Sequence, residues 1–379
     1  MFKKTIIAAS LIFSLTLPTI INAQISTAVP FLLIAPDSRA GGMGETGGGL
    51  ADNGAAIFWN PAGLAFLRGS EIQITHSNWL PQFHLDLFYD YATYRTYLDD
   101  LDGAIFASIT YMNFGEFVRT GEGSPEPIGT FRSFDAAATI GYATTLGKDW
   151  GLGFNFRVIH SRLSEKPTGQ EQGTGVATTV SFDLATMYRP EALDNRFSVG
   201  LNISNMGPKI YYIDQEQADP LPTNMRLGFA GRLWEDDFNS LTLTADFTKL
   251  LVTKRDSTTD SDPFYEALFT SWTDDGSFKE ELKQIVSSFG MEYWYGQPGD
   301  FMFAARAGYF YEDPHYGNRK FVTFGASIRY DIYQFDFSYL STTLAGGDEN
   351  HPLGETLRFT VAFKWGEQNE TVRGFPKGI

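Results

Sequence analysis

Long stretches of the chain alternate apolar and polar residues with a period of two. The clearest is 355–366, where every second residue from Leu357 to Trp365 is apolar, and 239–251 and 332–343 show the same pattern. Successive side chains of a β-strand point to opposite faces of the sheet, so each segment is predicted to be a strand with one apolar and one polar face. A soluble β-sandwich would show the same alternation. The choice therefore depends on strand length, number and parity.

The alternation recurs in fourteen segments of about ten to fifteen residues. A tilted strand that crosses a membrane needs ~9–11 residues, whereas strands of soluble proteins typically have ~5–6. An even number of strands also lets an antiparallel sheet close without a free edge. We therefore predict an all-β fold, a 14-stranded antiparallel transmembrane β-barrel. The predicted strands are 69–79, 82–96, 103–113, 132–145, 150–164, 174–189, 195–206, 223–234, 239–251, 286–296, 300–311, 319–330, 332–343 and 355–366.

The connections between the predicted strands alternate in length. Short links such as 146–149 and 297–299 follow even-numbered strands, and longer ones such as 114–131, 207–222 and 252–285 follow odd-numbered strands. In outer-membrane barrels the short turns face the periplasm and the long loops face the exterior. The pattern predicts a bacterial outer-membrane protein whose N-terminus and C-terminus both lie on the periplasmic side.

Aromatic residues gather near the ends of the predicted strands. Amphipathic rings at such positions are typical of the girdles at the headgroup level of a membrane barrel. In a soluble β-protein the same residues would belong to the core. The residues are Tyr89, Tyr91, Tyr94, Tyr97, Tyr293, Trp294, Tyr295, Tyr309, Tyr311, Tyr330, Tyr333 and Trp365.

The N-terminal residues have the three parts of a secretory signal peptide. Lys3 and Lys4 precede an apolar run to about Leu17, and a short polar end leads to Ala23. The run is shorter than the ~20 residues of a membrane-spanning helix, which disfavours the alternative of an uncleaved anchor. We predict four regions: a cleaved signal peptide at 1–23, an N-terminal segment and plug at 24–68, the barrel at 69–366 and a periplasmic tail at 367–379.

Composition and motifs disfavour several classes of function. The formal net charge is -16 and the chain has no cysteine, which argues against a nucleic-acid partner and against thiol catalysis. The five histidines lack metal-ligand spacing, and no HExxH, GxSxG or SxxK motif occurs. Residues 42–47 match the dinucleotide pattern GxGxxG, but no alternating helices and strands follow it. We expect no catalytic residues, cofactor or metal; a barrel lipase with a Ser/His pair assembled across strands remains an alternative.

One long loop has a helical pattern in an otherwise β-rich chain. Residues 264–286 carry apolar side chains at spacings of three and four, interrupted by polar residues at 273–276, which predicts two short helices in an extracellular loop. These helices could pack over the barrel mouth or form a docking surface for a partner, and the sequence is compatible with both. Together with 114–131, this loop holds the predicted partner-binding residues: Phe114, Phe117, Arg119, Phe131, Phe264, Tyr265, Leu268, Phe269 and Trp272.

A glycine-rich segment, 30–66, precedes the first predicted strand and is interpreted as a plug inside the barrel. Glycine permits close backbone approach in a crowded lumen, and Asp37 and Arg39 are expected to pair with each other or with inward wall residues. Asn60-Pro61 is expected to end the plug, because a residue before proline avoids the helical conformation. A structural role is favoured over ligand contact. The wall candidates are Arg157, Asp246, Arg306, Arg329 and Asp336, and the plug motif comprises Pro36, Asp37, Arg39, Gly42, Met43, Gly44, Asn60 and Pro61.

Two motifs in this segment resemble known families. NPAGL at 60–64 is similar to an element of the FadL family of outer-membrane channels, which have fourteen strands and an N-terminal hatch. IAPDSRAGGMG at 34–44 resembles the PorV/PorQ group of FadL-like proteins in the type IX secretion system.

The PorV/PorQ resemblance implies a non-enzymatic secretion component. Such a protein would accept cargo proteins with C-terminal secretion domains at a SprA/Sov-type translocon and pass them to a PorU-type sortase complex, surrounded by outer-membrane lipid. The FadL resemblance implies the alternative, a channel for fatty acids or other hydrophobic small molecules.

Overall fold

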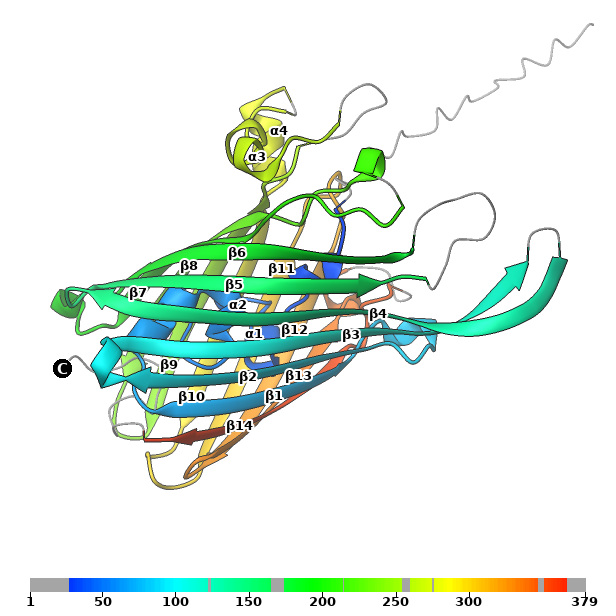
Figure 1. Cartoon of the computed structure of the whole chain (residues 1–379). Coiled ribbons are helices and arrows are strands. Elements are labelled where there is room, and N and C mark those ends of the chain that lie inside the picture. Colours follow the sequence, from blue (N-terminus) through cyan, green and yellow to red (C-terminus); the bar gives the residue numbers. More distant parts are fainter. Residues whose placement is uncertain are drawn as a thin grey trace, which may run out of the picture.

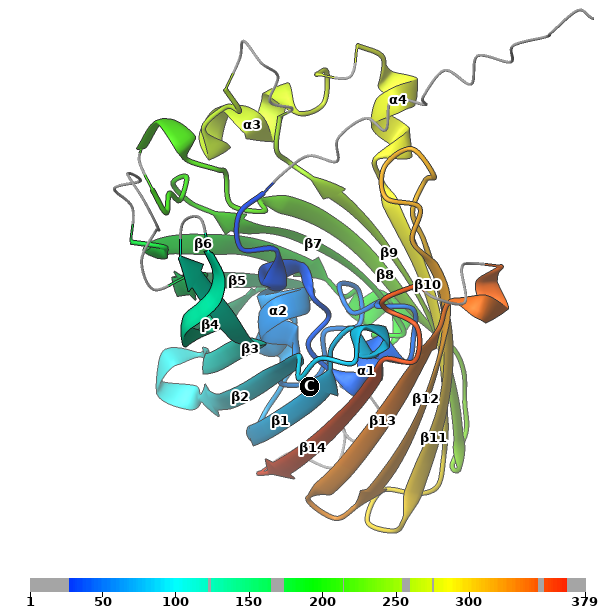
Figure 2. The same cartoon turned by 90° about the vertical axis from the view of Figure 1, so that its right-hand side faces the viewer.

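The computed structural model describes residues 27–121, 124–164, 174–213, 215–253, 260–274, 276–346 and 351–366. Fourteen antiparallel strands form a closed barrel in which each strand pairs with its sequence neighbours and β14 pairs with β1 (Figures 1 and 2). The predicted barrel is thereby confirmed. The predicted signal peptide and C-terminal tail lie outside the described residues. Among the described residues, no helix is long and apolar enough to cross a membrane.

The elements follow the predicted order closely. The strands are β1 (Ser70–Asn78), β2 (Phe88–Leu98), β3 (Gly103–Gly121), β4 (Ser124–Leu146), β5 (Trp150–Arg162), β6 (Val176–Tyr188), β7 (Phe197–Met206), β8 (Asn224–Glu235), β9 (Asn239–Leu250), β10 (Val286–Tyr295), β11 (Met302–Tyr311), β12 (Lys320–Tyr330), β13 (Tyr333–Ser341) and β14 (Leu357–Trp365). The α-helices are α1 (Ser38–Gly41), α2 (Ala56–Trp59), α3 (Phe264–Thr270) and α4 (Phe278–Lys283). The 3₁₀ turns are η1 (Pro30–Leu33), η2 (Pro61–Phe66), η3 (Pro81–Phe83), η4 (Asp99–Leu101), η5 (Glu191–Leu193), η6 (Gln215–Gln217) and η7 (Thr343–Ala345). The two helices predicted after β9 are confirmed as α3 and α4.

The burial pattern of the strands separates a membrane barrel from a soluble sandwich. On β5 the apolar side chains of Phe154 and Phe156 are 44% and 40% exposed, whereas Asn155 and Arg157 between them are 0% and 6% exposed. A soluble protein would bury the apolar set. A barrel in lipid turns it outward and keeps its polar residues inside. The wall therefore presents an apolar surface to the bilayer.

Aromatic pairs lie on the outer face near the short-link end of the barrel. The rings of Trp150 and Tyr188 are 4.8 Å apart, and those of Phe301 and Tyr330 are 4.4 Å apart. Three residues of the predicted girdles are instead inside the barrel and buried: Tyr89, Tyr91 and Trp294. They occupy inward positions of their strands, so they belong to the lumen core. Proximity to a strand end could not distinguish the two faces.

The predicted loop 114–131 is a strand hairpin. β3 and β4 continue past the barrel rim with cross-strand partners such as Glu116 and Arg132, after a bulge that begins at Asn113. Gly115 has a φ of +85°, which suits glycine at such an irregularity. Figure 1 shows the hairpin extending well beyond the other strands. We call residues 114–121 and 124–133 the outer hairpin.

The second strand begins later than predicted. Residues 82–87 are not strand, because Pro81–Phe83 forms η3 and both Leu80 and His84 have left-handed backbone angles. The link between β1 and β2 therefore extends over 79–87. A long connection here agrees with the long loops that follow the other odd-numbered strands.

Residues 28–67, the lumenal segment, run through the inside of the ring of strands (Figure 2). At one end, the amide of Ala28 donates to the carbonyl of Pro220, in the long link between β7 and β8, at 3.1 Å. At the other end the segment leads into β1 on the short-link side. The first described residues therefore lie at the long-link end, whereas the N-terminus itself, expected on the periplasmic side, lies outside the described residues. The parity argument located the start of β1 but not a segment that crosses the lumen before it.

This path predicts that residue 27 is accessible from outside the cell. The chain has no cysteine, so Thr27→Cys and Lys148→Cys each provide a single thiol. Lys148 is exposed in the short link between β4 and β5. We expect a membrane-impermeant maleimide to label the Thr27 variant in intact cells, and to label the Lys148 variant only after the outer membrane is permeabilised. The reverse pattern would show that the segment enters from the periplasmic side.

Candidate functional site

The lumenal segment begins its first α-helix with Asp37. This carboxylate caps α1 by accepting from the amide of Ala40 at 3.1 Å, and it also accepts from the indole nitrogen of Trp59 at 2.7 Å. The capping bond satisfies an otherwise free amide of the first turn. Pro36 is buried just before the cap. Asp37 thus joins the two α-helices of the segment to each other and does not pair with Arg39 as was considered possible.

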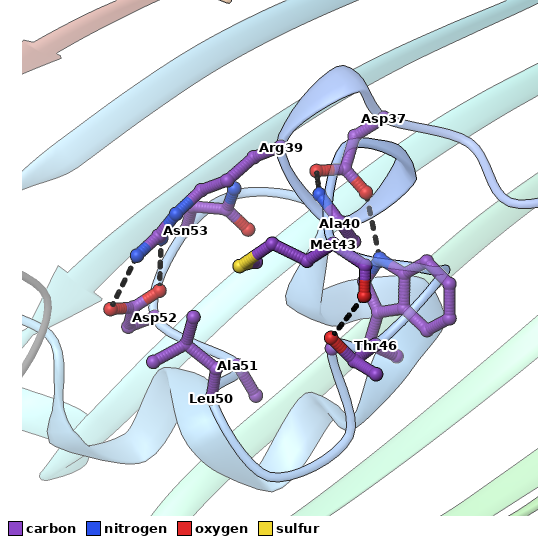
Figure 3. A pocket seen from close by; sticks show the side chains of 11 residues that line it. Asp37, Arg39, Ala40, Met43, Thr46, Leu50, Ala51, Asp52 and Asn53 are labelled. Atoms are coloured by element: carbon purple, nitrogen blue, oxygen red, sulfur yellow. Dashed lines mark hydrogen bonds and ion pairs between the residues drawn. The ribbon is translucent and has the colours of Figure 1, made fainter. Parts of the chain in front are cut away.

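Arg39 holds the segment to the wall. Its guanidinium pairs with Asp52 on the same segment and with Glu292 on β10, where the closest approach is 2.7 Å. All three side chains are less than a tenth exposed. Figure 3 shows Arg39 and Asp52 facing each other beside a small cavity. Neither Asp52 nor Glu292 was among the partners predicted from the sequence.

Glu292 extends the contact into the wall. It also accepts from Nε of Arg306 on β11 at 2.6 Å, and Arg306 in turn contacts Asp336 on β13 at 3.1 Å. The predicted wall residues Arg306 and Asp336 are therefore connected to Arg39 only through Glu292. A buried charge needs a compensating partner. Each of these charged groups has one.

Asp246 on β9 makes a second polar anchor. Its carboxylate accepts from the amides of Gly47 and Gly48 at 2.9 and 2.8 Å. It was predicted to face the plug and does so. From the segment it binds backbone groups and not Arg39, and its charged partner is Arg226 of β8 at 3.5 Å. A third anchor joins Ser38 to Thr360 of β14, with 2.8 Å between their hydroxyl oxygens.

Glycines allow the segment and the wall to meet backbone to backbone. A methyl group on Gly308 of β11 would lie 1.9 Å from the amide nitrogen of Gly44, and one on Gly42 would lie 2.9 Å from the Cα of Gly325 on β12. Gly44 also has a φ of +70°, a conformation that L side chains rarely adopt. Met43 lies between these two glycines and is 1% exposed. The GGMG part of the motif is therefore explained by close packing, without a ligand.

Asn60 before Pro61 leaves the helical conformation, as predicted, and ends α2, but the segment continues because Pro61 starts η2. Asn60 accepts from the amide of Ala62 at 3.0 Å and donates to the carbonyl of Thr186 at 3.2 Å, and Pro61 occupies the first turn of η2. A proline is favourable there because its missing N–H would have no helical partner. η2 then fills the short-link end of the lumen against β4, β5 and β6.

Two cavities border the lumenal segment, and each is small. One, of about 10 Å³, is lined by residues that include Arg39, Asp52 and Trp59 (Figure 3). The other, also about 10 Å³, lies between Leu32 and the inward face of β2 to β5. A volume of this size holds about one water molecule. Within the described ranges, no three His, Cys, Asp or Glu side chains come together as a metal site would require.

The predicted partner-binding residues lie in two separate places. Phe114, Phe117, Arg119 and Phe131 are on the outer hairpin, where the rings of Phe117 and Phe131 stack at 5.7 Å. The other set lies on α3 or shortly after it: Phe264, Tyr265, Leu268, Phe269 and Trp272. The structure does not bring the two sets together into one surface.

Comparison with protein families identifies the chain. Residues 19–257 match the family model described as "Type IX secretion system protein PorV". This is more than half of the chain, and the match includes the whole lumenal segment. The chain belongs to the PorV family. The resemblance seen in the motif IAPDSRAGGMG is confirmed, and the description is that of a secretion-system protein, not an enzyme.

One solved structure shows the same fold, and a second is similar. A Pseudomonas aeruginosa FadL homologue has a TM-score of 0.51 and 12% identity, over 90% of this chain and 99% of that chain. A Pseudomonas putida toluene transporter, TodX, has a TM-score of 0.49 and 12% identity, over 86% of this chain and 97% of that chain. No curated protein gave a significant match. Family and fold together make this chain an outer-membrane component of the type IX secretion system with a FadL-like barrel.

The buried ionic contact gives a prediction for stability. Arg39→Ala removes the charge that compensates Asp52, and removing one partner of a buried pair typically costs about 3–5 kcal/mol. We expect a loss of that order in the free energy of unfolding, measured by reversible urea unfolding in lipid vesicles. Arg119→Ala on the outer hairpin is the matched control and should unfold like the wild type. Equal stability of the two variants would contradict a structural role for Arg39.

Proposed function

We propose that this PorV-family protein binds exported proteins carrying a C-terminal secretion domain at a SprA/Sov-type translocon and passes them to a PorU-type sortase complex. The family match over 19–257 carries the proposal. Such a carrier needs surfaces outside the membrane for its partners. It needs no passage through its own barrel.

The packing of the lumen supports a carrier over a channel. The lumenal segment meets the wall through close glycine contacts, three polar anchors and apolar clusters that include Trp59 and Leu64. A FadL-like channel for fatty acids or other hydrophobic molecules would require a route past these contacts. The shared fold alone does not favour that alternative, because the identity to the FadL homologue is 12%.

We assign cargo contact to the outer hairpin. Its pairing with β2 ends at Asn113 and its pairing with β5 begins at Phe134, so between these points neither edge pairs with another strand of the described ranges. Val118 and Ile128 are 60% and 61% exposed. Open sheet edges and exposed apolar side chains are the features by which an extended segment of another protein adds to a sheet.

Shortening the outer hairpin tests this assignment. Replacing 116–132 by an Asn-Gly turn keeps the barrel strands and removes the projecting part. We expect affinity purification of tagged wild type from its native outer membrane to recover translocon, sortase and exported proteins, and the shortened variant to lose at least nine-tenths of the exported proteins. Leu344→Ser, an exposed change in another long loop, is the control. Recovery of the barrel alone with a bound hydrophobic molecule would move the assignment to a FadL-like channel.

A disulfide between the lumenal segment and the wall would distinguish a carrier, in which the segment can stay fixed, from a channel in which it must move. Ser38 and Thr360 are in direct contact, so Ser38→Cys/Thr360→Cys in this cysteine-free chain should cross-link on oxidation. We expect secretion to be unchanged in the oxidised form. Loss of secretion that a reductant restores would mean that the segment leaves its position during transport. The two single-cysteine variants control for the substitutions themselves.

A further inference from the structure

The segment that contains α3 and α4 lies against the outer face of the barrel wall. We call residues 260–274 and 276–285 the outer strap. Phe264 on α3 packs edge-on against Phe182 of β6, with ring centroids 5.8 Å apart. Phe182 is an outward residue, because its neighbours Ser181 and Asp183 are buried in the lumen. Seen along the barrel in Figure 2, α3 and α4 lie outside the ring of strands.

A second contact joins the strap to the outer face of β9. Lys249 follows Phe247 at the next outward position, yet it is only 1% exposed. Its ammonium group lies 2.9 Å from Glu281 of α4 and 5.4 Å from the ring centre of Trp272. A cation that would otherwise face lipid is thus neutralised and covered by the strap.

Both contacts lie at the level where a neighbouring or the same strand ends on the long-loop side. Phe182 pairs with Met206, the last residue of β7, and Lys249 is the second-last residue of β9. Just below Lys249 on the outer face, Phe247 contacts Phe229 and Phe289 within the apolar wall. Val180 of β6 lies beyond Phe182 toward the long loops and is also an exposed outward residue. The strap therefore lies alongside the long-loop end of the lipid-facing band.

The strap also presents large apolar side chains that no described residue covers. Tyr265 and Phe269 are 57% and 77% exposed on one face of α3, and Phe278 and Leu282 are 71% and 49% exposed on one face of α4. Each pair is four residues apart and so lies on the same side of its helix. On α3 the opposite side is buried at Ala267. On α4 Glu281, which lies beside the exposed face, is buried by its contact with Lys249.

We propose that the outer strap is an interfacial membrane element whose exposed aromatic side chains lie among the acyl chains of the outer leaflet. Its apolar faces continue the lipid-facing band of the wall to which it is attached, and an amphipathic helix at this level buries its apolar side in the headgroup and acyl boundary. The strap also carries acidic residues such as Glu266 and Glu280, so its attachment depends on apolar contact and not on anionic headgroups. This assignment differs from the partner-docking role considered for the same loop and is independent of cargo.

Lipid quenching of a fluorescent label tests the proposal. The purified full chain, in single-cysteine variants Phe269→Cys and Phe278→Cys, carries an environment-sensitive label and is reconstituted as one copy per phosphatidylcholine nanodisc. Leu152→Cys on the lipid-facing wall and Phe117→Cys on the outer hairpin are the lipid and water controls. We expect lipids with a nitroxide near the headgroup to quench positions 269 and 278 at least threefold more than position 117, and within twofold of position 152.

Three results would overturn it. Quenching no greater than at Phe117 would leave the strap in water. Protection from aqueous iodide without lipid quenching would mean that another part of the protein covers these side chains. Lipid quenching that requires anionic lipid would mean that the strap is held by binding to headgroups and not by apolar contact. A second copy is excluded by the single occupancy of the nanodisc, and no exported protein is present, so the result is separate from that of the secretion proposal.

Discussion

The structure depends on compensating polar groups that the membrane forces into the barrel. Because the outer face must be apolar, inward positions receive residues such as Glu292, Arg306 and Asp336, which need partners away from bulk water. Arg39 and Asp52 of the lumenal segment complete this set. The segment is thus part of the interior of the fold. Its position follows from the same requirement that produces the alternating strands.

The sequence predicted the barrel well, because the period of two reflects the contrast between lipid and lumen directly. It failed where that contrast is absent. The outer hairpin stands beyond the membrane, so 114–131 has no lipid-facing alternation and was interpreted as a loop. Tyr89 and Tyr91 belong to one apolar cluster of the lumen, and Trp294 to another with Met302 and Ala304. At these inward positions the residues are as apolar as those that face outward.

The candidate site was predicted in outline only. The glycine-rich pattern predicted the segment, and the charge of Arg39 within that pattern marked this residue as a candidate. Both signals depend only on neighbours in the sequence. The partners Asp52 and Glu292 depend on which strand faces which part of the segment, and this is set by the closed ring. Glu292 did carry a usable signal, as the acidic residue in the apolar stretch FGMEYWY of β10. Nothing local distinguished Asp52 from other acids in loops.

The contact between Ser38 and Thr360 spans 322 positions in the sequence. It cannot form before β14, the last described strand, has been synthesised, and β14 is also the strand that closes the ring against β1. α1 also lies against β12 and β13, so this helix is held mainly by the last part of the ring, through contacts of very high sequence separation. An assembly intermediate that lacks β14 would have an unclosed sheet and an incompletely held lumenal segment at the same time. One hydrogen bond thus joins the first α-helix of the segment to the strand that closes the barrel.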